Sequence, residues 1–257
     1  MKIIKIVSDY LNQNSYLIVE GKDALLVDAG VFVKDIEESL KLCTEKPQLR
    51  GVLLTHEHFD HIKELDNIMS KYSCPAYIHE SGRDNLFDEE KNMSIMDTPF
   101  KIKNKKDVKK FKDGEILKIG EIAISCHHTP GHSMGSSCFV VDNNMFTGDT
   151  IFKVGYGRND LFGGDEFVQK VSLEKLRNNL IGNIENFYPR SFDDVAIIID
   201  HLLAGKPEIV HLTDVKPTTA QRVIDLLSGA IYVLNGNLCE LKKEVYIFTP
   251  NGVRVNQ

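Results

Sequence analysis

The sequence predicts an α/β (α+β) fold in which two similar halves pack as a sandwich of sheets and helices. Short β-rich runs are followed by helical stretches in the first 80 residues, and the same order returns after Gly114. The chain has 257 residues, of which 42% are hydrophobic and 26% charged. This balance is typical of one large globular domain with, at most, a small appendage.

Strands and helices alternate in the first half. The segment Asp28-Ala29-Gly30 interrupts the third β-rich run, and apolar residues then recur at helical spacing. A turn at 20–23 joins the second and third runs as a hairpin. The expected elements are strands at 2–7, 15–20 and 24–27, a helix at 33–43, a strand at 51–54, a helix at 62–72 and a strand at 74–78.

The second half begins after a polar stretch at 82–112, which we expect to be a loop or flap. Ser172 is a candidate N-cap for a helix that starts there, and Ser191 or Asp193 for the next helix. We expect a catalytic domain at 1–205 and a C-terminal extension at 206–257 packed on it. The elements of this half are strands at 115–119, 121–125, 137–141 and 144–147, helices at 172–181 and 193–203, a strand at 207–212, a helix at 218–227 and a hairpin-like end.

Charge and composition disfavour several classes of partner. The net charge is −6 and the pI is about 5.9, so we expect neither nucleic acid nor a membrane surface as a partner, but a small-molecule substrate. The lysine-rich segment 101–112 is interpreted as a solvated face. The N-terminal apolar run is too short for a signal peptide, and the five cysteines have no CxxC spacing, so we expect a cytoplasmic protein with reduced thiols.

Five titratable residues crowd into six positions directly after the strand at 51–54: His56, Glu57, His58, Asp60 and His61. Two histidines at i and i+2 on an extended segment point to one side, and the acid and histidine after them form a second cluster. Neutral imidazoles and carboxylates are ligands that zinc, iron and manganese prefer. The alternative is an exposed polar loop. The pattern favours a metal site, with Glu57 as a loop or surface residue that is not a ligand.

Two later segments supply what this cluster lacks. Pro130-Gly131 makes a turn that presents His132 just after a strand, as a third imidazole. Asp149 leaves the end of a strand next to Gly148, which permits a close approach of the backbone. Other histidines, such as His127 and His128, are expected at strand ends rather than as ligands.

Four motifs occur together in a set order, and with them the sequence resembles the metallo-β-lactamase-fold hydrolase superfamily. They are DAG at 28–30, THEHFDH at 55–61, TPGHS at 129–133 and TGD at 147–149. NSYLIV at 14–19 and GRNDLFGGD at 157–165 resemble the glyoxalase II-like branch of that superfamily. The resemblance covers residues 1–205. It implies a four-layer αββα metallo-β-lactamase sandwich with the site at one edge, between the sheets.

The resemblance also implies ligands and an activity. His56, His58 and His132 would hold a first metal ion, Asp60 and His61 a second, and Asp149 would bridge them. The cofactors would be two divalent metal ions. Zinc is the preferred metal for both, and iron and manganese are the alternatives. The expected activity is hydrolysis of a thioester or ester, as in a hydroxyacylglutathione hydrolase, by metal-activated water that Asp60 orients. Two alternatives stay open: a mononuclear iron oxidoreductase resembling persulfide dioxygenases, and a degenerate binding or regulatory scaffold.

The family pattern fails at its last ligand. A further histidine usually follows in a PGHG-like loop, and the matching place here reads Tyr-Pro-Arg-Ser, with Ser191 where the histidine would be. That ligand is either lost or replaced by His211, Asp193 or Asp194. If it is lost, we expect the second metal site to be weak, completed by solvent or empty. The extension at 206–257 could cover the active site, bind a partner or form a homodimer contact.

Overall fold

The computed structural model describes residues 1–9, 11–152, 155–180 and 185–249. It divides the chain into two compact units, Met1–Leu173 and Glu174–Gln257. The boundary expected at 205 lies later in the chain than this division. The difference arises because the helix and strand before 205 share a hydrophobic core with the segment that follows.

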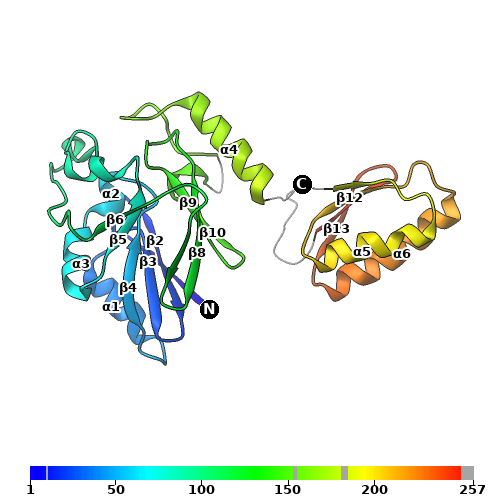
Figure 1. Cartoon of the computed structure of the whole chain (residues 1–257), viewed down its shortest axis with the longest axis horizontal. Coiled ribbons are helices and arrows are strands. Elements are labelled where there is room, and N and C mark those ends of the chain that lie inside the picture. The colour runs from blue at the N-terminus through cyan, green and yellow to red at the C-terminus, as the bar shows by residue number, and fades with distance from the viewer. Residues whose placement is uncertain (10, 153–154, 181–184, 250–257) are drawn as a thin grey trace. The chain divides into compact units, whose positions relative to one another are not determined.

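A six-stranded sheet forms the N-terminal part of the first unit (Figure 1). Its strands stand in chain order. The first three are antiparallel neighbours, and the remaining pairs are parallel. They are β1 (Lys2–Val7), β2 (Asn14–Glu20), β3 (Asp23–Val27), β4 (Gln48–Leu53), β5 (Ala76–His79) and β6 (Val108–Phe111). β6 lies inside the stretch 82–112 that was expected to be a loop, so that expectation is wrong for its last part. Lysines at two of the four positions obscured the strand pattern.

A four-stranded antiparallel sheet follows, in the order β10, β9, β8, β7. Its strands are β7 (Ile116–Ile119), β8 (Ile122–His128), β9 (Ser137–Val141) and β10 (Asn144–Phe146). Alternate residues of both sheets make one core. Leu25 and Leu53 from the first sheet pack with Ile124 and Phe139 from the second. The expected α/β class and the two-sheet sandwich are therefore confirmed.

Helices α1 (Val33–Lys41) and α3 (Leu65–Tyr72) pack on the other face of the six-stranded sheet. Because β-strand side chains alternate between faces, Leu26 and Val52 point to these helices while their neighbours Leu25 and Leu53 point to the second sheet. The four-residue helix α2 (Phe59–Ile62) and the 3-10 helices η1 (Arg83–Phe87), η2 (Ser94–Met96) and η3 (Gly148–Thr150) complete the unit's turns.

Helix α4 (Glu166–Leu180) begins before the Ser172 cap that the sequence predicted. The Asp165 carboxylate accepts a hydrogen bond from the Val168 amide at 2.9 Å and so caps the helix instead. Ser172 lies inside the helix, and its hydroxyl donates to the carbonyl of Pro130 at 2.7 Å. α4 is therefore fastened to the loop that carries His132.

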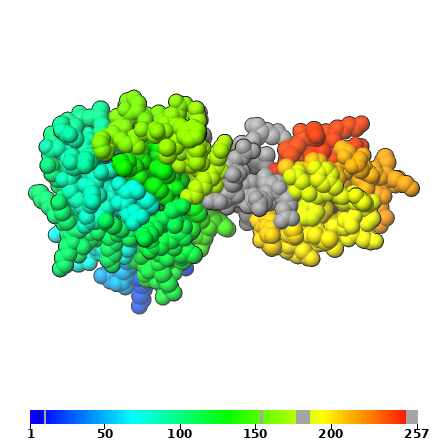
Figure 2. All heavy atoms as spheres, turned by 45° about the horizontal axis from the view of Figure 1, so that its top comes forward, coloured from blue at the N-terminus to red at the C-terminus, as the bar shows by residue number. Residues whose placement is uncertain are grey.

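The second unit is a four-stranded sheet with two helices, coloured yellow to red in Figures 1 and 2. The strand order is β11, β12, β14, β13, with only the first pair parallel. Side chains of both helices and of the two central strands share one hydrophobic core. The elements are β11 (Glu185–Phe187), η4 (Phe192–Asp194), α5 (Val195–Leu203), β12 (Glu208–His211), α6 (Pro217–Val233), β13 (Asn237–Lys242) and β14 (Val245–Thr249). None of the described helices is long and apolar enough to cross a bilayer.

Candidate metal centre

The motif at 55–61 sits where β4 gives way to α2. The Leu53 carbonyl accepts a hydrogen bond from the Asp28 amide, and the His61 carbonyl accepts one from the Ala29 amide at 2.7 Å. The two residues that follow β3 therefore fix the position of the chain just before the motif and at its last residue. His58 stays extended, with φ −68° and ψ 146°, and is the last residue before α2.

Three imidazoles converge at this point from two loops. His58 Nδ1 lies 3.0 Å from His132 Nε2, which in turn lies 3.3 Å from His56 Nε2. The three residues are 1–3% exposed. Three ring nitrogens this close cannot all be satisfied by sharing protons, because each pair needs one donor and one acceptor. A cation between them resolves the conflict, so the residues present fit a metal ion.

The outer nitrogens of two of these rings have fixed partners. His132 Nδ1 donates to the Arg158 carbonyl at 2.6 Å. The Thr55 hydroxyl donates to Asp28 Oδ2 at 2.8 Å and accepts from His56 Nδ1 at 3.0 Å. Both rings therefore direct an unprotonated Nε2 toward the centre, as metal ligands do.

Burial favours the neutral form of His56 and His58. It lowers the pKa of His58 to about 3, with help from the neighbouring His132 and His61. Burial, together with the charge of His61, likewise holds the pKa of His56 well below its usual value. A neutral imidazole has the free electron pair that a metal bond requires.

A second group lies beside the first. His61 Nε2 is 3.3 Å from Asp149 Oδ1 and 3.6 Å from Asp60 Oδ2, while its Nδ1 donates to Asp28 Oδ2 at 2.8 Å. The other oxygen of Asp149 lies 3.6 Å from His132 Nε2, so this carboxylate stands between the two groups. Gly148 has φ +48°, and a Cβ there would overlap the Thr55 side chain, so glycine is needed for Asp149 to reach this position.

Electrostatics in the second group also favour a cation. Burial acts to lower the pKa of His61, but Asp28, Asp60 and Asp149 outweigh it and raise that pKa well above its usual value. Burial acts to raise the pKa of Asp149, but the hydrogen bond and charge of His61 lower it. A proton on His61 thus supplies positive charge among three carboxylates, which is the charge that a metal ion would bring.

Two geometric groups able to hold a metal ion emerge from the described residues: His56 with His58 and His132, and His56 with His61 and Asp149. All six ligands expected from the sequence, Asp60 included, therefore lie together at one edge of the sandwich. Their individual roles, and the catalytic role of Asp60, stay predictions. The expected pairing of Arg158 with Asp160 is confirmed at 2.7 Å.

Glu57 was expected to be a loop or surface residue. It lies in the loop between β4 and α2, but it is 0% exposed, so a surface position is wrong. Its carboxylate accepts hydrogen bonds from the Ser133 hydroxyl at 2.9 Å, the Gly135 amide at 3.2 Å and the Asn85 side chain at 3.0 Å. A Cβ on Gly135 would overlap this carboxylate. Glu57 thus joins the loop of His56 and His58 to the loop of His132, and the local letters HEHFDH gave no sign of that long-range contact.

The residues weighed for the last metal ligand belong to the second unit. Asp194 Oδ2 accepts hydrogen bonds from the Ser191 and Arg190 amides at 2.9 and 2.8 Å, so Ser191 begins the helical segment η4–α5, as its expected capping role required. His211 Nε2 lies 2.8 Å from Asn186 Oδ1, and its ring stacks on Tyr188. From the sequence, this segment was aligned with the family's final metal-binding loop. In the structure the segment belongs instead to the hydrophobic core of the second unit.

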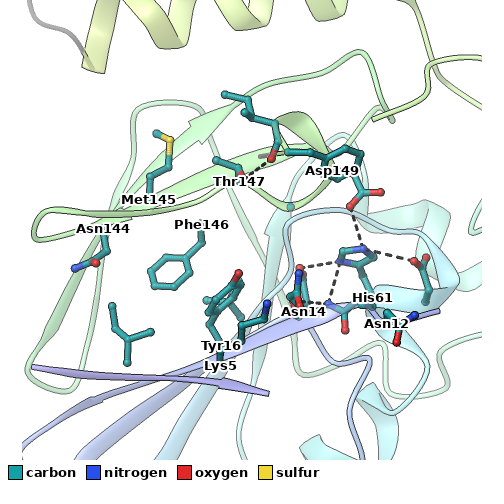
Figure 3. A pocket seen from close by; sticks show the side chains of 18 of the residues that line it. Lys5, Asn12, Asn14, Tyr16, His61, Asn144, Met145, Phe146, Thr147 and Asp149 are labelled. Carbon is teal, nitrogen blue, oxygen red and sulfur yellow. Dashed lines mark hydrogen bonds and ion pairs between the residues drawn. The ribbon is translucent and has the colours of Figure 1, made fainter. Parts of the chain in front are cut away.

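A cavity of about 770 Å³ opens beside the second group. Figure 3 shows Asp149 and His61 at one end and Lys5, Tyr16 and Phe146 along its length. The volume is within the range of small-molecule sites, about 300–1,000 Å³. Asp60 and His61 line this cavity, and a small-molecule substrate stays a prediction.

Comparison with known proteins agrees with this geometry. The family model of the metallo-beta-lactamase superfamily matches residues 9–209. A probable metallo-hydrolase of Bacillus subtilis, YqgX, is 35% identical over 170 residues, which cover 65% of this chain and 79% of that protein. The crystal structure of BLEG-1 B3 metallo-beta-lactamase superposes with a TM-score of 0.63 at 31% identity, covering 70% of this chain and 86% of that one.

The second unit has a different likeness. The family model of the cell division protein SepF matches residues 184–255. SepF of Acetivibrio thermocellus is 32% identical over 98 residues, which cover 35% of this chain and 63% of that protein. The SepF match and the superfamily match thus overlap between 184 and 209, within the second unit. With its four motifs in order, its two-sheet sandwich and the converging histidines, the chain belongs to the metallo-beta-lactamase superfamily.

Proposed function

We propose that the first unit is a metal-dependent hydrolase of a small thioester or ester, similar to a hydroxyacylglutathione hydrolase. One observation carries the proposal: three buried imidazoles, with ring nitrogens 3.0 and 3.3 Å apart, lie beside His61 and Asp149, which line a cavity of small-molecule size. The name of the relative YqgX, a probable metallo-hydrolase, supports the reaction class.

In this proposal His56, His58 and His132 hold the first ion, and His61 and Asp60 the second, with Asp149 between them. Bound divalent ions would supply Lewis-acid activation of a water and of the substrate carbonyl. Zinc suits the nitrogen-rich first group, and iron or manganese are the alternatives.

The chain's own residues prepare the reaction. Asp60, whose side chain is 20% exposed, reaches both His61 and the cavity, so it can accept a hydrogen bond from the attacking water and orient it. Asp28 holds the His61 ring in one orientation, and the cavity walls position the substrate. Four of the five cysteines are buried and all are free, which supports the proposed cytoplasmic location.

The test combines metal analysis with turnover. Purified protein should contain up to two zinc ions per chain and hydrolyse S-lactoylglutathione or simple thioesters, and His58→Ala should lose both metal and activity. Because BLEG-1 is described as a metallo-beta-lactamase, a β-lactam belongs in the same panel. Metal-loaded protein that hydrolyses none of these ester, thioester or lactam substrates would contradict the proposal.

A second candidate is an oxidoreductase with a single iron at the first group. The composition of the second group favours it. In the described part of the first unit this group contains no histidine beyond His56 and His61, so a second ion would have few nitrogen ligands. About one iron per chain and no hydrolysis would support it, whereas two zinc or manganese ions favour hydrolysis. Purified protein that binds no metal would instead support a degenerate scaffold.

For the second unit we propose a role in bacterial cell division, on the strength of its likeness to SepF over 184–255. Contact with a partner protein or with a second copy of the chain would then be its task. A fluorescently tagged full chain should gather at the division site. Diffuse fluorescence in dividing cells, with full-length protein on a gel, would contradict this role.

A further inference from the structure

We propose that the cavity beside the metal centre receives the carboxylate-bearing end of an acyl substrate, and that Lys5 is the cation that binds it. This deepens the proposed hydrolase function and rests on it. It assigns a substrate class, an acyl compound with an anionic end remote from its scissile carbonyl, and a specificity-determining residue.

The cavity is a passage from the second metal group along the two sheets. One wall comes from β1, β2 and the loop between them, and the other from β10 and the segment after it. Asp60, His61 and Asp149 lie at one end (Figure 3). A substrate that places its reacting carbonyl there must extend the rest of its length along these walls.

Charge is distributed unevenly along the lining. Its carboxylates are Asp28, Asp60 and Asp149, and all three contact His61. Lys5 is the one lysine or arginine among the described lining residues, and it has no carboxylate partner within the part of the chain that the structure describes. The cavity thus offers an unpaired ammonium group away from its acidic end.

Lys5 lies on β1, which forms part of the cavity wall. It stands opposite Tyr16 in the register of β1 and β2, and the Tyr16 ring meets Phe146 edge to face at 5.3 Å. Figure 3 shows Lys5, Tyr16 and Asn14 among the side chains that line the cavity. A lysine ammonium in such a polar lining can receive a carboxylate through a charge-assisted hydrogen bond.

The same wall is tied to the metal end. In the loop between β1 and β2, Leu11 and Asn12 both have positive φ, 54° and 53°. The Ser8 amide donates to the Gln13 carbonyl at 2.8 Å and closes this loop. Gln13 Nε2 also lies 3.4 Å from His61 Nδ1. The distance between the anion site and the metal centre is therefore set by a closed loop, so the cavity can select substrates by length as well as by charge.

The test uses equilibrium binding, which needs no turnover. Two pairs of non-hydrolysable thioether analogues are titrated into zinc-loaded full-length protein by calorimetry. One pair carries a carboxylate or its methyl ester on the acyl side of the sulfur, and the other pair carries them on the thiol side. The variants are Lys5→Met and, as a matched control on the same strand, Lys2→Met, because the Lys2 ammonium bonds the Leu42 carbonyl and lies outside the cavity.

In at least one pair the carboxylate analogue should bind about tenfold more weakly to Lys5→Met than to the unaltered protein. The affinity of the methyl ester for Lys5→Met should differ less than twofold from its affinity for the unaltered protein. The affinity of the carboxylate analogue for Lys2→Met should also change less than twofold. Because the metal centre itself attracts anions, the dependence on Lys5, and not the raw preference for the carboxylate, is the decisive quantity. Equal binding of the carboxylate analogues to the Lys5→Met variant and the unaltered protein would overturn the inference.

The outcome can be separated from that of the proposed function. Loss of the Lys5 effect with thioester hydrolysis intact would refute only the anion site. A Lys5-dependent carboxylate site in a protein that hydrolyses no ester or thioester would refute only the hydrolase.

Discussion

Glu57 offers the sharpest test of how the metal centre is assembled. It stands between His56 and His58, is fully buried, and accepts hydrogen bonds from three neighbours, Ser133, Gly135 and Asn85. Replacing it by alanine leaves the Gly135 amide and the Asn85 side-chain amide without this acceptor, while the Ser133 hydroxyl keeps only Ser136 Oγ, at 2.9 Å, as a partner. Each orphaned donor costs about 1–3 kcal/mol, and release of the buried carboxylate offsets part of the sum. We expect Glu57→Ala to lower the free energy of unfolding of the first unit by about 3–5 kcal/mol.

The same substitution should weaken metal binding. Loss of a group that orients ligands typically costs about 10–100-fold in metal affinity, and Glu57 holds the loops of His58 and His132 together. We therefore expect zinc to bind the first group of Glu57→Ala about 10–100-fold more weakly. Glu57→Gln keeps the shape and one acceptor oxygen, and Asn85 can turn its carbonyl toward the new amide. The expected loss is then about 1 kcal/mol in stability, with metal affinity largely retained.

Two measurements decide the matter. Zinc affinity comes from competition with a chromophoric chelator, and stability from urea unfolding, in which the transition that zinc shifts identifies the first unit. Glu64→Gln is the control, because the Glu64 carboxylate bonds Asn67 at an exposed site. If Glu57→Ala binds zinc and unfolds like the Glu64→Gln control, Glu57 does not hold the two loops together.

Three further predictions concern other buried groups. Asp28→Asn removes the carboxylate that accepts a hydrogen bond from His61 Nδ1, so it should reduce the metal content from about two ions per chain to one. The control Asp84→Asn, at an exposed position, should leave two ions. Elemental analysis that finds an unchanged metal content in Asp28→Asn would contradict this. Because the pKa of His61 is raised in the metal-free fold, this group stabilises the protein below its ordinary pKa and loses that effect as pH rises through the folded value. Loading the second ion at pH 7 should accordingly release about one proton, measured by calorimetry in buffers of different ionisation enthalpy; no dependence on the buffer would refute it. Burial raises the pKa of Cys126 to about 12, so iodoacetamide at pH 8 should label half-buried Cys239 and leave Cys126 unmodified by mass spectrometry, and rapid labelling of Cys126 in folded protein would contradict its burial.

The ligand set could be predicted from the sequence because its chemistry is local. His56, His58 and His61 owe their positions to one strand end and the turn after it. His132 and Asp149 follow strand ends on the facing sheet, and each motif carries its own glycine or proline. Residue types and strand positions indicated a metal site, and the family resemblance supplied the sandwich and the assignment of each ligand.

The supporting contacts could not be predicted in the same way. Glu57 meets Ser133, and Lys5 faces the cavity, through the packing of segments distant in sequence. Neither residue type nor spacing reveals such partners. β6 was missed because its lysines at 109 and 110 mask the apolar alternation, although an edge strand commonly carries lysine.

The segment between 184 and 209 shows how a family resemblance can extend beyond the fold that it describes. Both family models match it, yet its strands and helix can complete only one core. β12 pairs with β14 in antiparallel register, and Val195, Ile198 and Leu202 of α5 pack with Val223 and Leu227 of α6. Residues of α6 and β14 lie beyond 209, so the buried apolar area binds this segment to the SepF-like unit. Tyr188-Pro189 then precedes a helix cap, and the serine at 191 is a capping residue rather than a substituted metal ligand. Within the described part of the first unit, the residues that would hold the proposed second ion are Asp60, His61 and Asp149.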